Sequence, residues 1–161
     1  MGKIEHTEAE EGAEMSVNRI SGSIIGAAIE VHKALGPGML ESAYQECLVS
    51  EMLARGHRVE LQRAFPVVYK GTATRRRFRL DLIVDDRVLV EIKAVKHLLP
   101  VHEAQILSYL RLARLPLGLL INFHCTTLVA GLRRFRVSVP SSPSVPSTTK
   151  GESSCQPSKR N

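Results

Sequence analysis

Three charged residues lie inside two apolar runs near the middle of this 161-residue chain. Asp81 lies in FRLDLIV (78–84), and Glu91 and Lys93 lie in RVLVEIKA (87–94). Charged side chains are rarely buried without partners, so these three either face solvent or serve chemistry. Two carboxylates held close together repel each other unless a cation lies between them, and oxygen ligands suit Mg²⁺ or Mn²⁺. With a lysine beside them, they offer what phosphodiester hydrolysis needs, which is an oriented water nucleophile and charge compensation.

The alternation of apolar and polar residues predicts that both runs are β-strands, because strand side chains have a period of two. Asp81 is then expected on the strand face opposite to its apolar neighbours Leu80 and Leu82. Glu91 and Lys93 are expected to share one face of the second strand. The three charged residues can therefore face the same side of a sheet.

The connection between the two runs, Asp85-Asp86, is expected to be a hairpin turn, although it lacks the usual glycine. Folding the chain back there places Asp81 opposite position 90 or 91, depending on the length of the loop. Asp81 and Glu91 can then lie close together on one face.

The same spacing has a simpler explanation. Alternating charge is common on antiparallel strands that have one face in water. Asp81, Glu91 and Lys93 would then form surface ion pairs on a half-exposed hairpin. Spacing alone leaves both interpretations open.

The elements that must position these residues are predicted from the rest of the pattern. Helical spacing of apolar residues predicts helices over residues 17–35, 39–54 and 100–114. Runs rich in β-branched or apolar residues predict further strands over residues 57–62, 66–71 and 115–123. This order of elements predicts a mixed α/β architecture in which helices cover the sheet.

Length and composition limit the domain organisation. A chain of 161 residues with 43% hydrophobic residues has room for one compact domain. The Glu-rich residues 1–15 and the Ser/Pro-rich residues 139–161 cannot bury enough surface to offset the entropy of ordering them. We therefore expect two disordered tails around a domain of residues 16–138.

Cysteines and hydropathy predict the compartment. The cysteines Cys47, Cys125 and Cys155 lie far apart without CxxC spacing, so we expect ordinary reduced thiols. No stretch approaches the length of a membrane span, and the N-terminus lacks a signal segment. A cytoplasmic protein without a membrane partner is expected.

The net charge of +6 fits a polyanionic partner, although many basic proteins bind no nucleic acid. A basic turn, TATRRR (72–77), is expected to lead into the strand of Asp81. Such a run is either a solvated loop or a contact to a phosphate backbone. The candidate nucleic-acid contacts of this segment are Arg75, Arg76, Arg77 and Arg79.

Several blocks occur in a consistent order: LGPGMLESAYQECL, FPVVYKG, RLDLIV, VLVEIKAV, LLPVHEAQILSYLRL and LGLLINF. With them the chain resembles the GxxExxY family, a branch of the PD-(D/E)XK nuclease-like superfamily. The naming motif is present as Gly38, Glu41 and Tyr44, and the similarity extends from about Val17 to Arg136. The resemblance implies an α/β fold with a restriction-endonuclease-like core, in which helices flank a central mixed sheet. It also implies a nuclease of DNA or RNA that depends on Mg²⁺ or Mn²⁺.

The resemblance assigns roles to individual residues. Asp81 and Glu91 match the two acidic metal ligands, and Lys93 matches the catalytic lysine of the ExK motif. The main-chain carbonyl of Ile92 would also face the ion. Glu41 matches an acidic residue that many members supply from an early helix, although a glutamate is also favoured there by the helix dipole.

The resemblance also draws attention to Gln105 and Tyr109, which form QxxxY in the last predicted helix. In exonuclease-like branches this motif helps to position the metal site or the nucleic-acid strand, and here the two residues lie one helical turn apart. Gln105 is thus a candidate catalytic residue and Tyr109 a candidate nucleic-acid contact. Packing within the helix is the alternative for both. Tyr44 is expected to pack in the core.

The sequence departs from the family in the arginine-rich segment before RLD and again after Phe123, so substrate contacts there can differ. The alternative to a nuclease is a non-catalytic module with a nuclease fold, which binds nucleic acid or a protein partner without cleavage. A homodimer is a further expectation, because nuclease-like domains this small often need a second subunit to complete a binding surface.

Overall fold

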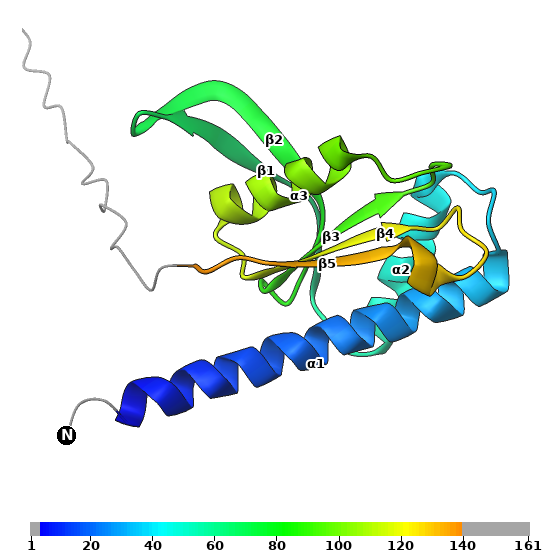
Figure 1. Cartoon of the computed structure of the whole chain (residues 1–161), viewed down its shortest axis with the longest axis horizontal. Coiled ribbons are helices and arrows are strands. Elements are labelled where there is room, and N and C mark those ends of the chain that lie inside the picture. The colour runs from blue at the N-terminus through cyan, green and yellow to red at the C-terminus, as the bar shows by residue number, and fades with distance from the viewer. Residues whose placement is uncertain (1–3, 140–161) are drawn as a thin grey trace, which may run out of the picture.

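A five-stranded mixed sheet forms the centre of the structure, a computed structural model that describes residues 4–139, with side chains from residue 11 onward (Figure 1). The strands are β1 (Val59–Tyr69), β2 (Thr72–Val84), β3 (Val88–Lys93), β4 (Leu117–Asn122) and β5 (Leu132–Arg136), and they lie side by side in this order. The pair β3 and β4 is parallel, and the other neighbours are antiparallel.

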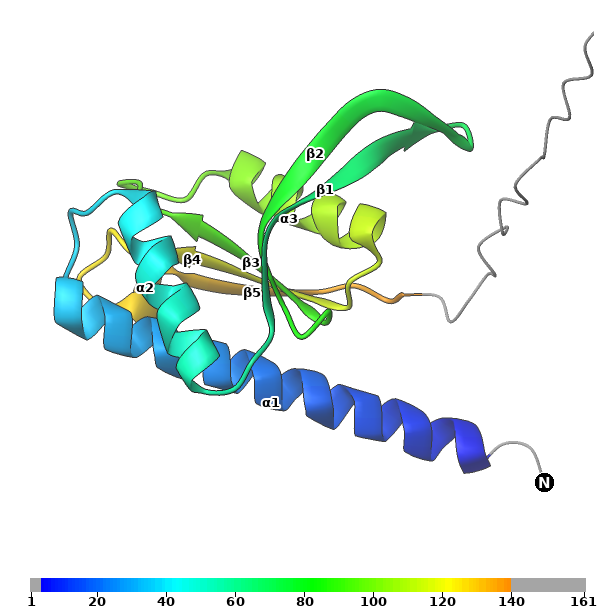
Figure 2. The same cartoon turned by 180° about the vertical axis from the view of Figure 1, so that it is seen from behind.

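Helices cover both faces of the sheet. Helices α1 (Ile4–Leu35) and α2 (Glu41–Ala54) lie on one face, and α3 (Pro100–Ala113) lies on the other (Figures 1 and 2). A short 3₁₀-helix, η1 (Leu128–Gly131), precedes β5. The predicted α/β fold with a central mixed sheet flanked by helices is confirmed, and it is consistent with a restriction-endonuclease-like core. Of the helices in the described residues, none has an apolar stretch long enough to cross a bilayer.

The larger core lies between the sheet and the pair of helices α1 and α2. Ile24 of α1 and Tyr44 of α2 are fully buried there, against Leu82, Val90 and Leu119 of the central strands. The apolar stripe of each helix faces the sheet, which is the arrangement that its 3.6-residue spacing predicts. Burial of this stripe contributes most of the stability of the two helices.

The second core lies under α3, the crossover that joins the parallel strands β3 and β4. Ile106 and Leu110 of α3 lie directly over Gly118 of β4. A Cβ atom on Gly118 would lie 2.9 Å from Ile106 Cδ1 and 3.0 Å from Leu110 Cδ1. The glycine therefore lets α3 approach the sheet closely.

The turn between β2 and β3 confirms the predicted hairpin. Asp85 and Asp86 have φ angles of 51° and 53°, and Arg87 N donates a hydrogen bond to the Val84 carbonyl at 3.0 Å. Two consecutive left-handed residues give the tight turn that suits twisted antiparallel strands, and aspartate tolerates this conformation. The last pair of the β2–β3 ladder before Asp81 is Leu82↔Val90, and one further step in this register would place position 91 opposite position 81.

The predicted alternation in β2 is wrong at one point. Leu82 packs in the core of α1 and α2, whereas Leu80 packs in the core under α3, so the two leucines do not share a face. The strand bends at Asp81, and the opposite residue on β1, Gln62, has a φ of 52°. A non-glycine residue in the left-handed region breaks the regular pleat, which a period-two pattern cannot anticipate.

The predicted strands 57–62 and 66–71 are one continuous strand, β1. The TATRRR segment, predicted to be a turn, belongs to β2, and the turn is formed instead by Lys70 and Gly71, with φ angles of 49° and 79°. Pro66 does not interrupt β1, because β1 is an edge strand and can leave one side of its backbone unpaired.

Two further differences lie near the ends of the domain. Strand β5 was not predicted, and it pairs with β4 through Leu119↔Arg134 and neighbouring residues. Helix α1 begins at Ile4, although residues 1–15 were expected to be disordered. Extending a helix costs less than nucleating one, and Glu14 Oε1 accepts a hydrogen bond from Arg136 Nη1 at 2.6 Å. Residues 1–3 and 140–161, which include nearly all of the predicted C-terminal tail, lie outside the described residues.

Candidate active site

Glu91 and Lys93 lie two residues apart on β3 and contact each other, as their predicted common face requires. Lys93 Nζ donates a hydrogen bond to Glu91 Oε1 at 2.8 Å. Only 4% of the Glu91 side chain and 16% of the Lys93 side chain are exposed. The simpler interpretation of a solvated hairpin face is therefore wrong for this pair, which is buried at the end of the central strand.

The second carboxylate oxygen of Glu91 is buried without a hydrogen-bond partner in the part of the chain that the structure describes. Among the described residues, Glu91 Oε2 is the buried side-chain oxygen that has no hydrogen-bond partner. A buried carboxylate oxygen without a donor is costly, and a cation is one of the few ligands that can satisfy it. The chemistry of Glu91 thus fits a hard divalent metal ion.

Asp81 approaches Glu91 from β2, and its electrostatic effect on Glu91 is clear. Burial is the main cause that raises the pKa of Glu91, and the charge of the Asp81 carboxylate raises it further. The hydrogen bond and the charge of Lys93 act in the opposite direction, without cancelling the increase. A buried carboxylate whose ionisation is disfavoured by a second carboxylate nearby is the pattern expected of a cation site.

Lys93 is held in its charged form. Burial lowers the pKa of Lys93, but the hydrogen bond to Glu91 and the charges of Glu91, Glu41 and Asp81 raise it more strongly. The net pKa is above the usual value for lysine. An ammonium group of this kind suits the stabilisation of negative charge on a phosphate and does not suit proton abstraction.

Glu41, in the first turn of α2, reaches the end of β3. Its Oε1 atom accepts a hydrogen bond from Ala94 N at 3.0 Å, and its charge raises the pKa of Lys93. The structure therefore brings Glu41 beside the lysine, although one of its oxygens is occupied by the backbone. Helix α2 and the chain that follows β3 are joined by this contact.

Tyr44 explains the position of Glu41. The Tyr44 hydroxyl donates a hydrogen bond to the Gly36 carbonyl at 2.6 Å and accepts one from Met39 N at 3.0 Å. Gly38 lies between these two points with a φ of 109°, which favours glycine. Tyr44 is fully buried, as predicted, and it fixes the loop that leads into the first turn of α2.

Ile92, whose carbonyl was predicted to face the ion, pairs with Ile121 of β4 and buries its side chain in the core of α1 and α2. The side chain has no part in the site. The role of the carbonyl stays a prediction.

Asn122 is a positioning residue that sequence reasoning missed. It is buried at the end of β4, opposite Lys93. Its Oδ1 atom accepts a hydrogen bond from Val95 N at 3.0 Å, and its Nδ2 atom donates one to the Val95 carbonyl at 2.7 Å. Phe123 N also donates to the Lys93 carbonyl at 2.8 Å. These bonds fix the chain directly after Lys93. A polar residue closing the apolar run LGLLINF was the available signal.

Gln62 of β1 is a second missed residue. Its Nε2 atom lies 3.5 Å from Asp81 Oδ1, at the bend of β2. This weak contact depends on the left-handed backbone of Gln62. No pattern in the sequence signals it.

Gln105 and Tyr109 interact with each other and not with the carboxylates. Gln105 Nε2 donates a hydrogen bond to the Tyr109 hydroxyl at 2.6 Å, and the Tyr109 ring stacks on Phe78 of β2 at a centroid distance of 5.0 Å. In the described part of the chain, neither residue is hydrogen bonded to Asp81, Glu91 or Lys93. The structure places the pair at the base of the β1–β2 hairpin.

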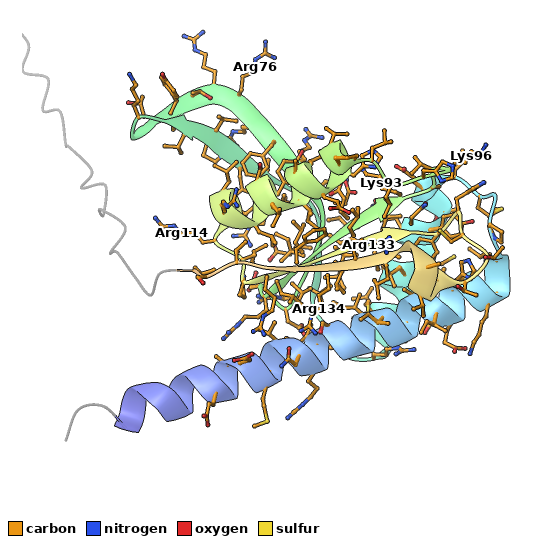
Figure 3. The ribbon with its side chains drawn as sticks, in the orientation of Figure 1. Arg76, Lys93, Lys96, Arg114, Arg133 and Arg134 are labelled. Carbon is orange, nitrogen blue, oxygen red and sulfur yellow. The ribbon has the colours of Figure 1, made fainter. Side chains whose placement is uncertain are left out.

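The four candidate arginines lie on β2 before Asp81, and all four are exposed. Beyond the bend, β1 and β2 extend away from the rest of the sheet (Figures 1 and 2). In Figure 3 the side chain of Arg76 points outward from this hairpin, whereas Lys93 lies at the main body of the molecule. The structure thus places Arg75, Arg76, Arg77 and Arg79 on the same strand as Asp81, between Asp81 and the tip of the hairpin.

The predicted metal ligands do not converge as a triad. Within residues 4–139 no group of three or more His, Cys, Asp or Glu residues lies close enough to hold a metal ion. Asp81 and Glu91 lie close enough for the charge of Asp81 to raise the pKa of Glu91, whereas Glu41 is hydrogen bonded to Ala94 N. The site offers a carboxylate pair with a lysine, which can bind a cation that keeps several water ligands.

Comparison with known proteins adds one match. The model of the family described as the PD-(D/E)XK nuclease superfamily matches residues 18–135, which run from α1 into β5. No curated protein and no solved structure gives a significant match.

Proposed function

We propose, since the chain belongs to the PD-(D/E)XK nuclease superfamily, that it is a metal-dependent nuclease that hydrolyses phosphodiester bonds in DNA or RNA. The observation that carries this proposal is the unpartnered, buried Oε2 atom of Glu91, next to the Asp81 carboxylate and the Lys93 ammonium. An unpaired buried carboxylate oxygen is costly, and a bound cation would offset that cost.

Asp81 and Glu91 would hold the ion, Mg²⁺ or Mn²⁺, with the Ile92 carbonyl and Glu41 as further proposed ligands. When bound, such an ion acidifies water and offsets negative charge on a phosphate. Carboxylate and carbonyl oxygens are the donors that these ions prefer.

The chain's own residues would do the remaining work. Lys93, held as an ammonium, would contact the phosphate and stabilise the charge that develops during hydrolysis. Asn122 would keep the end of β3 in place, and Glu41 would maintain the position of Lys93. Arg75, Arg76, Arg77 and Arg79 would contact the nucleic-acid backbone.

A non-catalytic binding module is the second candidate, and one observation favours it. Lys93 is already paired with Glu91, Glu41 is bonded to Ala94, and the described residues contain no triad of ligands. A site that has lost its ion could close in this way while the fold retained its affinity for nucleic acid or for a protein.

The experiment that separates these candidates is a cleavage panel of single- and double-stranded DNA and RNA, with Mg²⁺ or Mn²⁺. We expect metal-dependent cleavage by the wild type and its loss in Asp81→Asn, Glu91→Gln and Lys93→Met proteins that remain folded. Glu46→Gln, which removes an exposed carboxylate from α2, is the matched control and should cleave normally. Equal cleavage by all variants would refute the assigned residues. Absence of Mn²⁺ binding together with intact nucleic-acid binding would favour the module.

A further inference from the structure

The positive charge of the chain is concentrated in one segment. Residues 61–80, which we call the basic arm, contain six basic residues and no aspartate or glutamate. The whole chain has 22 Lys and Arg against 16 Asp and Glu, so the remainder carries 16 of each sign. The formal excess of +6 is therefore the charge of the basic arm. Its basic residues are Arg63, Lys70, Arg75, Arg76, Arg77 and Arg79.

The basic arm is a two-stranded antiparallel ribbon that projects from the sheet (Figures 1 and 2). Its strands pair from Arg63↔Leu80 to Tyr69↔Thr72, and the turn at Lys70 and Gly71 closes the tip. About nine residues separate the tip from the bend at Asp81, so the ribbon reaches roughly 30 Å from the candidate site.

An aromatic stack holds the base of the ribbon on α3. The rings of Phe65 and Phe78 stack at 5.5 Å, and Phe78 stacks on Tyr109 at 5.0 Å. The hydrogen bond from Gln105 fixes the Tyr109 hydroxyl. The basic arm thus has a supported direction, and Gln105 and Tyr109 act as its positioning residues.

Arginines project from both faces of the ribbon. Successive side chains on a strand point to opposite faces, so Arg76 lies on one face and Arg77 on the other. Both side chains are exposed, and Arg76 points away from the body of the molecule in Figure 3. Neither forms an ion pair with any acidic residue that the structure describes. A basic surface of this kind, on two opposite faces, suits a partner that surrounds it.

We infer that the basic arm binds duplex DNA by lying in the major groove. The major groove of B-DNA is about 12 Å wide and admits a two-stranded β-ribbon, whose backbones lie about 4.8 Å apart. Arginines on both faces can then reach the phosphates on both walls of the groove. The major groove of an RNA duplex is too deep and narrow for such a ribbon. The inference rests on the proposed function in one respect: it makes duplex DNA the substrate class of the site at the base of the arm.

The strand that carries the arginines also carries Asp81, which relates binding to the site. Arg79 precedes Asp81 by two residues, or about 7 Å. A duplex held along the whole arm would extend about nine base pairs from the site, at roughly 3.4 Å for each pair. Short duplexes that end near the site would lose most of the contacts of the arm.

Fluorescence anisotropy with the full chain in EDTA tests the inference, because no cleavage interferes. The probes are a DNA duplex, an RNA duplex and a DNA single strand of equal length. We expect the DNA duplex to bind most tightly. Arg76→Gln and Arg77→Gln should each weaken its binding several-fold and reduce the salt slope by about one, because each removes one phosphate contact. Arg87→Gln, an exposed arginine after the β2–β3 turn, is the matched control and should bind like the wild type.

Two results would overturn the inference: wild-type affinity in either arm variant, or equal affinity for the RNA duplex or the single strand. These results are separable from the proposed activity. Cleavage that persists while the arm variants bind like the wild type would refute the role of the arm alone. Arm-dependent binding of duplex DNA by a protein that cleaves nothing would refute the nuclease activity alone.

Discussion

Lys93 Nζ is hydrogen bonded to one carboxylate oxygen of Glu91 at 2.8 Å, and the other oxygen of the same carboxylate is buried without a partner. The lysine therefore compensates only part of the charge of Glu91. The charge of the Asp81 carboxylate also raises the pKa of Glu91. This half-satisfied carboxylate is the basis of the first two predictions.

Divalent metal should stabilise the folded protein through this carboxylate. A ligand at about one hundred times its Kd adds about 2.7 kcal/mol to the free energy of unfolding, so Mn²⁺ should raise the melting temperature by several degrees. Glu91→Gln and Asp81→Asn should abolish the shift, whereas the exposed Glu46→Gln should retain it. An undiminished shift in Glu91→Gln, measured by thermal unfolding, would show that the ion binds elsewhere.

Loss of the lysine should destabilise the fold. Lys93→Met leaves the buried Glu91 carboxylate without its counter-charge, and breaking a buried pair costs about 3 kcal/mol or more. Lys93→Arg keeps the charge and should recover much of this loss. Urea unfolding at neutral pH measures both variants. Equal stability of Lys93→Met and the wild type would mean that the pair contributes nothing to the fold.

The hydroxyl of Tyr44 should matter for the site at a distance. Tyr44→Phe keeps the stack on Phe123, with its 4.4 Å centroid distance, and removes the bonds to Gly36 and Met39. We expect a loss of about 1–2 kcal/mol in unfolding free energy and weaker Mn²⁺ affinity, because Glu41 follows this loop. Calorimetric titration measures the affinity. Loss of stability with unchanged Mn²⁺ affinity would separate Tyr44 from the metal site.

The turn at Asp85 should give the protein an acid-sensitive contact. Burial raises the pKa of Asp85. The hydrogen bonds from His57 and from Arg58 N lower this pKa, and so do the charges of the two residues. The lowering is the larger effect, so the net pKa is below the usual 3.8. A lowered carboxyl pKa adds stability that is complete well above pH 3.8 and disappears as the pH falls through the folded-state value. Asp85→Asn, which tolerates the same backbone, should therefore be less stable than the wild type near neutral pH.

Urea unfolding across this range measures the difference between the two proteins. The difference in unfolding free energy between the wild type and Asp85→Asn should shrink as the pH falls below 3.8, because the wild type then loses the ionised carboxylate. A difference that stays constant down to about pH 2 would show that the pairing of Asp85 with His57 has no electrostatic part.

The close approach of α3 to β4 should make Gly118 intolerant of a side chain. Gly118→Ala places a methyl group 2.9 Å from Ile106 Cδ1, and overpacking of this kind costs about 1–3 kcal/mol. Ile106→Val removes that Cδ1 atom, so the double variant should be more stable than the sum of the two single effects predicts. Additive effects in chemical denaturation would show that the strain of Gly118→Ala is relieved elsewhere.

The parts of the site that sequence could predict are those set by local periodicity. Glu91 and Lys93 share a face because strands have a period of two, and the Asp85-Asp86 turn then sets a register that would place position 91 opposite position 81. Resemblance to a family added Glu41, which lies 53 residues from its partner Ala94 and has no local signal of its own.

The missed features depend on contacts between distant segments. Strand β5 alternates in burial only weakly and depends on pairing with β4 for its stability. Gln62 takes a left-handed φ that no residue preference predicts. Asn122 acquires its role only when the ends of β3 and β4 lie side by side, which requires the α3 crossover to be in place. Tertiary context decided these features, and local preference could not reveal them.

The short turn between β2 and β3, residues 85–87, also bears on how the chain folds. Contacts between residues close in sequence form early, because closing a short loop costs little entropy. Asp81 and Glu91 are separated by ten positions and this turn, so the carboxylates meet in a local hairpin. We expect the parallel partner β4 to pair later, because it follows a long crossover that includes α3. On this order of events the like charges would come together while water still screens them, and their desolvation would follow when β4 and α3 complete the sheet.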